Sequence, residues 1–343
     1  MQIRSCVPLL LLPPLMLVAV ILIADCTDLP TPVAGLSYGF YNNSCSEAEN
    51  TVDELMKSFL TPNVSQAAGV IRLFFHDCFV QGEQQSIPNQ TLRPSALAII
   101  DQIKAELESV CPNTVSCADI LALAAREAIK QTNGSGFNIP TGRRDSLNFS
   151  NYATVLGNLP APTSNSSHLL SSFSSKGLNA IDLVPLSGAH TIGLAHCSSF
   201  SDRLRPTVDP RLNATFAQSL VQTCPNSSIN VAVNMDTVNP DTFDNKYYSN
   251  MMNGEVLFDS DAALLNDSLT QATVEEFAAE NHDFHIQFSI SFIKMSMIEV
   301  LTGNQGNIRK VCSVLNTNTR STITTADSYV APELDTPPSY SSM

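Results

Sequence analysis

The sequence predicts an all-α protein whose helical core covers about residues 36–316 and divides near Pro160. Stretches of strong helix formers with apolar residues at helical spacing recur along the chain. No long segment alternates between apolar and polar residues, as a half-buried strand would, and no internal repeat is found. Hydrophobic residues make up 43% of the 343 positions, which is enough for a sizeable core.

The helical patterns can be placed in order along the core. In the first half they cover residues 47–60, 69–80, 96–110 and 118–130, and a loop-rich segment follows at 132–167. In the second half they cover residues 179–184, 191–204, 213–223, 244–252, 269–280 and 286–301. We therefore expect one domain at residues 35–165 and a second at 166–316, followed at 317–343 by a disordered tail or propeptide rich in Thr, Ser and Pro.

The first residues predict a secretory signal. Arg4 precedes an apolar run at residues 7–23 that ends at Ala24. Two prolines favour a cleaved segment over an uncleaved membrane anchor, the alternative that the length of the run leaves open. Nine Asn-x-Ser/Thr sequons fit a secreted glycoprotein. We expect residues 1–34 to be a signal peptide and short leader, with cleavage between Ala24 and Ala34, and disulfides as the fate of the cysteines.

The charge balance excludes some partners. The chain has 18 Lys and Arg against 32 Asp and Glu, a formal net charge of −14, and it has no basic run. We therefore expect no nucleic acid as a partner, and no membrane once the signal is removed.

A polar pair lies inside an apolar helical stretch. Arg72 and His76 stand four residues apart in RLFFHDCF, so they share a helical face, with Phe75 beside them. For a lone histidine, a satisfied core position would be the ordinary explanation. The pair instead indicates peroxide chemistry, because an imidazole can move a proton between the two peroxide oxygens. A guanidinium can then stabilise the charge that develops on the leaving oxygen.

A second histidine, His190, follows a turn of small residues in LSGAHTIGLA. Small neighbours would let a flat macrocycle approach, and a histidine that binds haem iron usually donates its other ring nitrogen to a carboxylate. Asp261, in LFDSDAAL, is the candidate carboxylate. Taken alone, His190 could equally be a core histidine. Ser187 is a weak candidate nucleophile with His190 as its base, because two residues so close together on a tight turn rarely align for attack.

Six longer motifs strongly resemble those of the class III plant secretory peroxidases. In chain order they are RLFFHDCFVQG, CPNTVSCADILALAAR, GRRDS, LVPLSGAHTIGLAHC, FDNKYY and LTGNQGNIRKVC. The resemblance implies a two-domain helical fold that holds haem b between a distal and a proximal domain. It also implies a secreted monomer that reduces hydrogen peroxide in one two-electron step and then oxidises two phenolic donors.

Matched position by position, the resemblance implies roles for single residues. Arg72 resembles the transition-state stabiliser and His76 the distal acid and base. His190 resembles the iron ligand, Asp261 its hydrogen-bond partner, and Phe75 a residue of the haem pocket.

Further matches concern the pocket edge and the scaffold. Pro160, in LPAP, matches the proline whose carbonyl meets the aromatic donor. Asn89, in PNQTLR, is the nearest match to the asparagine that holds the distal histidine in its basic tautomer, although it lies in a sequon. Asp119 and Arg143 match a structural ion pair.

The resemblance also implies calcium. The proximal site would use Thr191, Asp236, Asn239, Thr242 and Asp244, with Asn239 in place of a threonine. All five offer the oxygen ligands that Ca²⁺ prefers. The alternative is a polar loop that caps the helix beginning near Asp244.

The distal calcium site is incomplete. Asp77, Val80 and Gly82 match its first half, but the chain then reads GEQQSIPN and lacks the long loop that supplies the second half. We therefore expect distal calcium binding to be impaired, with a shortened gene model as the alternative explanation.

The nine cysteines reflect the same shortening. Cys6 leaves with the signal, and Cys26 does too if cleavage falls after it. By resemblance the disulfides are Cys45–Cys111, Cys117–Cys312 and Cys197–Cys224. Cys78 remains single, because Glu83 stands where its usual partner would be.

Two functions remain in view. The leading one is a haem peroxidase, exported to the extracellular space or cell wall, with a vacuolar destination left open by the tail. The other is a secreted glycoprotein that keeps the scaffold but is catalytically impaired by the shortened distal loop.

Overall fold

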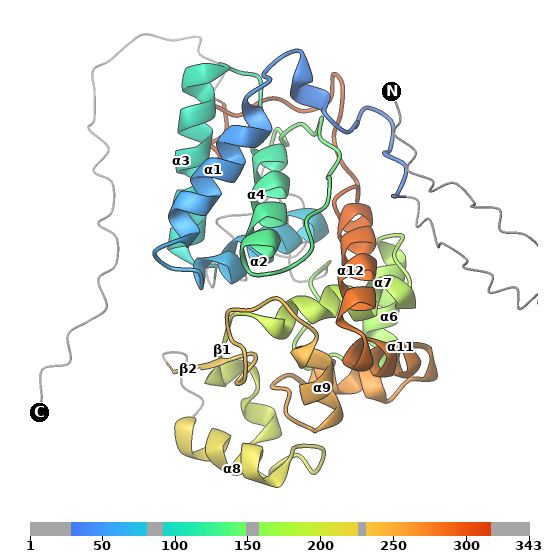
Figure 1. The fold of residues 1–343 in the computed structure, drawn as a ribbon. Helices are drawn as coiled ribbons and strands as arrows, with labels where there is room; N and C mark the ends of the chain where they lie inside the picture. The colour runs from blue at the N-terminus through green and yellow to red at the C-terminus, as the bar shows by residue number, and fades with distance from the viewer. Residues whose placement is uncertain (1–28, 81–91, 149–157, 226–230, 317–343) are drawn as a thin grey trace, which may run out of the picture.

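A computed structural model describes residues 29–80, 92–148, 158–225 and 231–316. Residues 1–28 of the expected signal and leader, the tail, Gly82 and Asn89 lie outside these ranges. Figure 1 shows the helices in an upper and a lower group. The upper group follows the short turn η1 (Phe40–Asn42) and contains α1 (Ala48–Leu60), α2 (Gln66–Val80), α3 (Pro94–Val110) and α4 (Cys117–Gln131).

The lower group contains most of the remaining helices. These are α6 (Ser166–Ser175), α7 (Ala180–Ser187), α8 (Ala214–Thr223), α9 (Lys246–Met252), α10 (Asp259–Ala262), α11 (Ser268–Ala279) and α12 (Asn281–Met295). Four short 3₁₀ turns join them, namely η3 (Gly188–Thr191), η4 (Cys197–Ser199), η5 (Ser201–Arg203) and η6 (Ala263–Leu265). The described residues contain one small antiparallel sheet, made of β1 (Leu194–His196) and β2 (Ala232–Asn234) with Ala195 opposite Val233. The all-α prediction is confirmed.

The predicted helix at residues 191–204 is wrong. The chain turns at Gly193, which has a φ of +101°, and β1 then pairs with β2 instead of forming i to i−4 bonds. A local pattern of apolar residues cannot distinguish these outcomes, because the partner strand lies almost 40 residues further along the chain.

Two other helices differ from expectation. The Ser-rich helix α6 falls partly in the predicted loop. It begins at Ser166, directly after the N-cap residue Asn165, whose side chain accepts a hydrogen bond from the His168 amide. Helix α12 begins and ends earlier than predicted. Just after its last residue, the Arg143 guanidinium donates two hydrogen bonds to the Ser296 carbonyl, from Nη2 at 2.7 Å and from Nε at 2.9 Å.

The larger of two apolar clusters runs through both groups of helices. Phe74 of α2 packs on Phe292 of α12 with ring centroids 4.9 Å apart, and Phe288 lies 5.6 Å from Phe292. A second, smaller cluster surrounds the disulfide Cys197–Cys224. Helix α12 thus joins the distal and proximal parts of the core.

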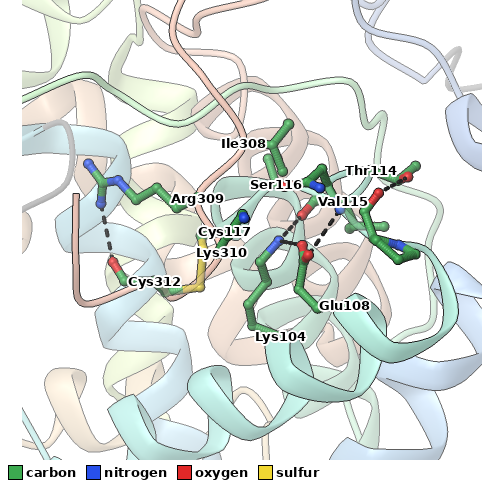
Figure 2. Close-up of polar contacts among 12 residues, drawn as sticks. Lys104, Glu108, Thr114, Val115, Ser116, Cys117, Ile308, Arg309, Lys310 and Cys312 are labelled. Atoms are coloured by element: carbon green, nitrogen blue, oxygen red, sulfur yellow. Dashed lines mark hydrogen bonds and ion pairs between the residues drawn. A yellow bond between two sulfur atoms is a disulfide. The ribbon is translucent and has the colours of Figure 1, made fainter. Parts of the chain in front are cut away.

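Three disulfides fix the scaffold, between the six cysteines that the resemblance paired. They are Cys45–Cys111, Cys117–Cys312 and Cys197–Cys224. Cys117–Cys312 spans 195 residues and attaches the end of the described chain to α4 (Figure 2). Beside it, the buried Lys104 ammonium donates to the Val115 carbonyl at 2.7 Å and pairs with Glu108 (Figure 2). Cys78 is buried and outside any disulfide.

None of the helices within the described ranges is both long enough and apolar enough to cross a membrane.

Candidate active site

The distal side of the site lies on helix α2, at the edge of the upper group that faces the lower one (Figure 1). Ala68, Arg72 and His76 are spaced by four residues and therefore share one face of α2. That face approaches the His190 segment, since a Cβ placed on Gly193 would lie only 2.9 Å from the Ala68 Cβ. The fold thus directs the Arg72–His76 face toward the chain that follows His190.

The two polar side chains of this face differ in exposure. His76 is buried, whereas Arg72 is accessible to solvent. Protein atoms packed around the Arg72 guanidinium nevertheless lower its pKa, and the like charge of Arg93 acts in the same direction. Arg93 precedes α3 and donates to the Ser65 carbonyl at 3.0 Å. A guanidinium keeps its proton near neutral pH even so, which makes Arg72 a permanent cation.

Phe75 supports this face from the side. Its half-buried ring lies 4.4 Å from the Phe79 ring and 6.0 Å from the His76 ring, centroid to centroid. The stacked phenylalanines restrict where the imidazole can move.

The proximal side of the site is the 3₁₀ turn η3, which carries His190 directly after α7. The His190 Nδ1 lies 2.9 Å from Asp261 Oδ1, and the Tyr247 hydroxyl donates to the same oxygen at 2.8 Å. Asp261 is buried, and an ionised carboxylate can only accept hydrogen bonds. We therefore assign the ring proton to Nδ1, which leaves a lone pair on Nε2.

Aromatic rings hold the His190 imidazole on two sides. Phe258 meets it edge to face with centroids 5.3 Å apart, and Tyr247 does so at 6.2 Å. Beneath the turn, Gly188 allows close packing, because a Cβ there would lie 2.3 Å from the Tyr248 hydroxyl. The His190 side chain is nevertheless 41% exposed, while its partner Asp261 is 2% exposed. The carboxylate is therefore buried behind an accessible imidazole.

These residues fit a haem iron. An accessible imidazole with a free lone pair, backed by a buried carboxylate, is the usual form of a histidine ligand. Pro160 lies in a half-buried segment that is attached to α10, because Ser260 donates to the Pro162 carbonyl at 2.9 Å. The same short helix thus carries Asp261 and fixes the chain just after Pro160.

The residues of the expected proximal calcium site lie together beside His190. Thr191 is buried, with its hydroxyl 3.4 Å from Asp244 Oδ1. Asn239 donates to Asp244 Oδ2 at 2.8 Å, and the Thr242 amide donates to the Asn239 carbonyl at 3.0 Å. Asp244 also accepts from the amide of Lys246 at the start of α9, so the capping role considered above coexists with this cluster.

Asp236 gives the strongest sign of a cation at this cluster. It is fully buried, and its Oδ1 accepts hydrogen bonds from Val238, Asn239 and Asn250. Its Oδ2 is buried without a hydrogen-bond partner among the described residues, which is costly for a carboxylate. No group of three or more His, Cys, Asp or Glu side chains in the described part of the chain is arranged to hold a metal ion. Two carboxylates with hydroxyl and amide oxygens suit Ca²⁺ rather than a transition metal.

The residues that the resemblance matched to a distal calcium site have different surroundings. Asp77 and Cys78 line a cavity of about 120 Å³ together with Arg143, Asp145 and Arg309. Burial and the charge of Asp145 raise the pKa of Asp77 to about 6, against the opposing effect of the two arginines. Burial and Asp77 also raise the pKa of the Cys78 thiol. Val80 ends α2 just before the described range stops.

Comparison with known proteins places the chain among the peroxidases. A family described as "Peroxidase" matches residues 49–280. Peroxidase 12 of Arabidopsis thaliana is 46% identical over 301 residues, which is 83% of this chain and 84% of that protein. Cationic peroxidase SPC4 of Sorghum bicolor is 46% identical over 303 residues, 84% of each chain. Peroxidase 66 of Zea mays is 40% identical, over 82% of this chain and 91% of its own length.

The helical fold and these similarities define a haem peroxidase, an enzyme that reduces hydrogen peroxide at the expense of a reductant. The chain belongs to the class III plant secretory peroxidases. Haem and calcium are the cofactors of this family, and its members are generally secreted.

The site contains residues that sequence reasoning missed. Tyr247 lies in the FDNKYY motif, but nothing in that motif shows that its hydroxyl reaches Asp261. Phe258 and Arg203 also went unassigned, although the Phe258 ring packs on His190 and Arg203 donates to the Phe258 carbonyl. The sequence around Arg203, FSDRLR, gave no signal for this contact, because the burial of Arg203 is visible only in the structure.

Proposed function

We propose that Arg72 and His76 activate hydrogen peroxide on the distal side and that His190 holds the haem iron on the proximal side. The observation that carries this proposal is the buried Asp261 carboxylate behind the accessible His190 imidazole, opposite the Arg72–His76 face of α2. When bound, haem supplies the redox-active iron that takes up the oxidising equivalents of peroxide.

The distal residues move one proton and stabilise one charge. A neutral His76 would accept a proton from one peroxide oxygen and deliver it to the other, which would leave as water. Arg72 stabilises the negative charge that develops on the departing oxygen as the O–O bond breaks. By resemblance, Asn89 would keep His76 in the tautomer that can accept the proton.

The proximal residues tune the ligand. Asp261 accepts the Nδ1 proton of His190 and so raises the basicity of the nitrogen that binds iron. Tyr247 donates to the same carboxylate oxygen and fixes its position. Burial and the charge of Asp261 raise the pKa of the Tyr247 hydroxyl, so it remains a donor.

Histidine variants test these roles. His190→Ala should abolish haem retention, seen as loss of the Soret band, because the iron loses its protein ligand. His76→Ala should retain haem but react with peroxide slower by about two to four orders of magnitude. His282→Ala, an exposed position on α12, serves as the control. Unchanged peroxide kinetics in His76→Ala would remove His76 from this role.

We propose that Thr191, Asp236, Asn239, Thr242 and Asp244 bind one calcium ion. The buried, unpaired Asp236 Oδ2 is the main support. Asp236→Asn should lower the calcium content by one ion per chain and remove the stabilisation that added calcium gives against heat. Asp241→Asn, at an exposed position in the same loop, should do neither. Equal calcium content in all three proteins would contradict the site.

The physiological donor is proposed to be a small phenol that meets the enzyme near Pro160. Guaiacol oxidation by the haem-loaded protein is the direct test, and haem binding without turnover would favour the impaired scaffold instead. We further propose a secreted monomer that divides into two domains at about residue 165. We propose that distal calcium binding through Asp77, Val80 and Gly82 is impaired, because the chain lacks the loop that would supply the second half of that site.

A further inference from the structure

We propose that Arg203 is a positioning residue for the proximal side of the site. Its guanidinium holds the segment Val256–Phe258, and through it Asp261, in the place where Asp261 orients His190. The proposal rests on the assignment of His190 as the iron ligand.

The contacts of Arg203 are unusually concentrated on one segment. The side chain is buried, and its Nη1 lies 2.5, 3.1 and 3.2 Å from the carbonyls of Val256, Leu257 and Phe258. These residues form no regular helix or strand, and Val256 and Leu257 are buried. Buried carbonyls of an irregular segment need a donor from elsewhere in the fold, and Arg203 supplies it.

The charge of Arg203 is balanced locally. Its Nε pairs with Asp209 Oδ2 at 2.9 Å, and the Asp209 amide donates to the Arg203 carbonyl at 2.7 Å. Arg211 binds both oxygens of Asp209 and also pairs with Asp259, the first residue of α10. Two arginines around one aspartate therefore hold both the segment before α10 and the first residue of that helix.

The segment that Arg203 holds is in direct contact with His190. Phe258 ends it, and the Phe258 ring packs edge to face on the His190 imidazole. Asp261 follows three residues later, within a helix of only four residues. A helix of one turn has little stability of its own, so tertiary contacts decide its position.

The consequence is electronic as well as structural. The hydrogen bond from His190 to Asp261 weakens steeply when its length or angle departs from the ideal. A weaker bond makes the imidazole a poorer electron donor to the iron, which favours the reduced metal and raises its potential. Loss of Arg203 should therefore raise the Fe(III)/Fe(II) potential without removing any group that touches the iron ligand.

The test compares four variants of the haem-loaded protein by spectroelectrochemical titration. Arg203→Gln should shift the potential positively by about 60 mV, a tenfold change in the one-electron equilibrium constant. Arg203→Lys, which keeps the charge but fewer donors, should shift it less. Arg205→Gln, an exposed arginine of the same loop that donates to the Cys224 carbonyl, should leave it unchanged. Asp261→Asn is the reference for complete loss of the carboxylate charge.

A further variant tests the proposal if Arg203→Gln does not fold. Arg211→Gln removes the pairing with Asp259 at a partly exposed position and should give a smaller positive shift. Arg203 loses its proposed role if its variants match the Arg205→Gln control while Asp261→Asn shifts the potential. If Asp261→Asn does not shift the potential either, the assignment of His190 and Asp261 as the proximal pair fails as well.

Discussion

At the scale of single residues, buried charges in this protein join segments that are distant in the sequence. Asp119 at the start of α4 is the centre of one such group. It accepts hydrogen bonds from the Tyr41 hydroxyl, from the amides of Gly142 and Arg143, and from the Arg143 guanidinium. The ion pair that the resemblance implied is therefore also an anchor for the chain on either side of it.

Asp119→Asn should lower the free energy of unfolding by about 3 to 5 kcal/mol, because the Arg143 charge would stay buried without its counter-ion. Denaturant titration measures the change. The matched control is Glu299→Gln, which removes an exposed pairing with Lys176 and should cost about 1 kcal/mol or less. Similar losses in both variants would contradict this assignment of energies.

The surroundings of Asp209 predict that the stability of the protein depends on pH. Burial alone would raise its pKa, but the hydrogen bonds and charges of Arg211 and Arg203 outweigh burial and hold the pKa well below its usual range. A depressed pKa adds stability that is fully present above the ordinary aspartate pKa of about 4 and is lost as the pH falls below it.

Asp209→Asn should therefore be less stable than the parent protein at pH 7, and this difference should shrink as the pH falls from about 5 toward 2. Urea unfolding at a series of pH values measures both curves. A constant difference across this range would mean that Asp209 does not titrate in the way described.

At the scale of elements, helix α7 delivers His190, and its first turn is fixed by a capping box. Asn179 Oδ1 accepts from the amides of Ile181 and Asp182, while Asp182 accepts from the Asn179 amide. The Asp182 carboxylate also accepts hydrogen bonds from the side chains of Lys294 and Ser291 of α12, at 2.9 Å each. The start of α7 is thus attached to the helix that runs beside it, and its end continues into the turn that carries His190.

Asn179→Ala should cost about 1 kcal/mol of stability, because two amides of the first turn lose their acceptor. Thermal unfolding of the haem-free protein is the measurement. Gln218→Ala, at an exposed position within α8, is the control and should stay within about 0.5 kcal/mol of the parent. A loss no larger than in the control would show that the cap contributes little.

At the scale of the whole molecule, the disulfide Cys117–Cys312 closes a loop of 195 residues, whereas Cys197–Cys224 closes one of 27. In the chain-entropy model the longer loop contributes about 2 kcal/mol more to stability. Replacing Cys117 and Cys312 by serines should therefore destabilise the protein more than replacing Cys197 and Cys224. Equal losses in denaturant titration would indicate that native packing, rather than unfolded-chain entropy, sets the contribution of these bonds.

The same three disulfides leave one cysteine over. A thiol reagent added to the denatured mature protein should detect one free thiol, that of Cys78, and the native protein should react slowly because this side chain is buried. Cys78→Ala supplies the control with no thiol. Two thiols in the denatured parent would mean that Cys26 is retained and unpaired. Three or more would show that a disulfide is missing, and none would mean that Cys78 is capped or paired with Cys26.

Local patterns were sufficient for most of the fold. Helices α1 to α4 follow from runs of strong helix formers, and their predicted bounds differ from the structure by at most three residues. The stretch after His190 was misjudged because a left-handed glycine and a distant strand partner decide its conformation. Helix α6 was missed because its serines favour caps and turns in isolation.

The sequence by itself determined the family and the helical class, and it predicted the Arg72–His76 and His190–Asp261 pairs, because chemistry of this kind leaves a motif of fixed residue types. The tertiary structure decided how those pairs are supported. Tyr247, Phe258 and Arg203 act on Asp261 and His190 through contacts between segments some 15 to 70 residues apart, which no local pattern encodes. The physical reason is that a hydrogen bond or ring contact depends on distance in space, while a motif records only order along the chain.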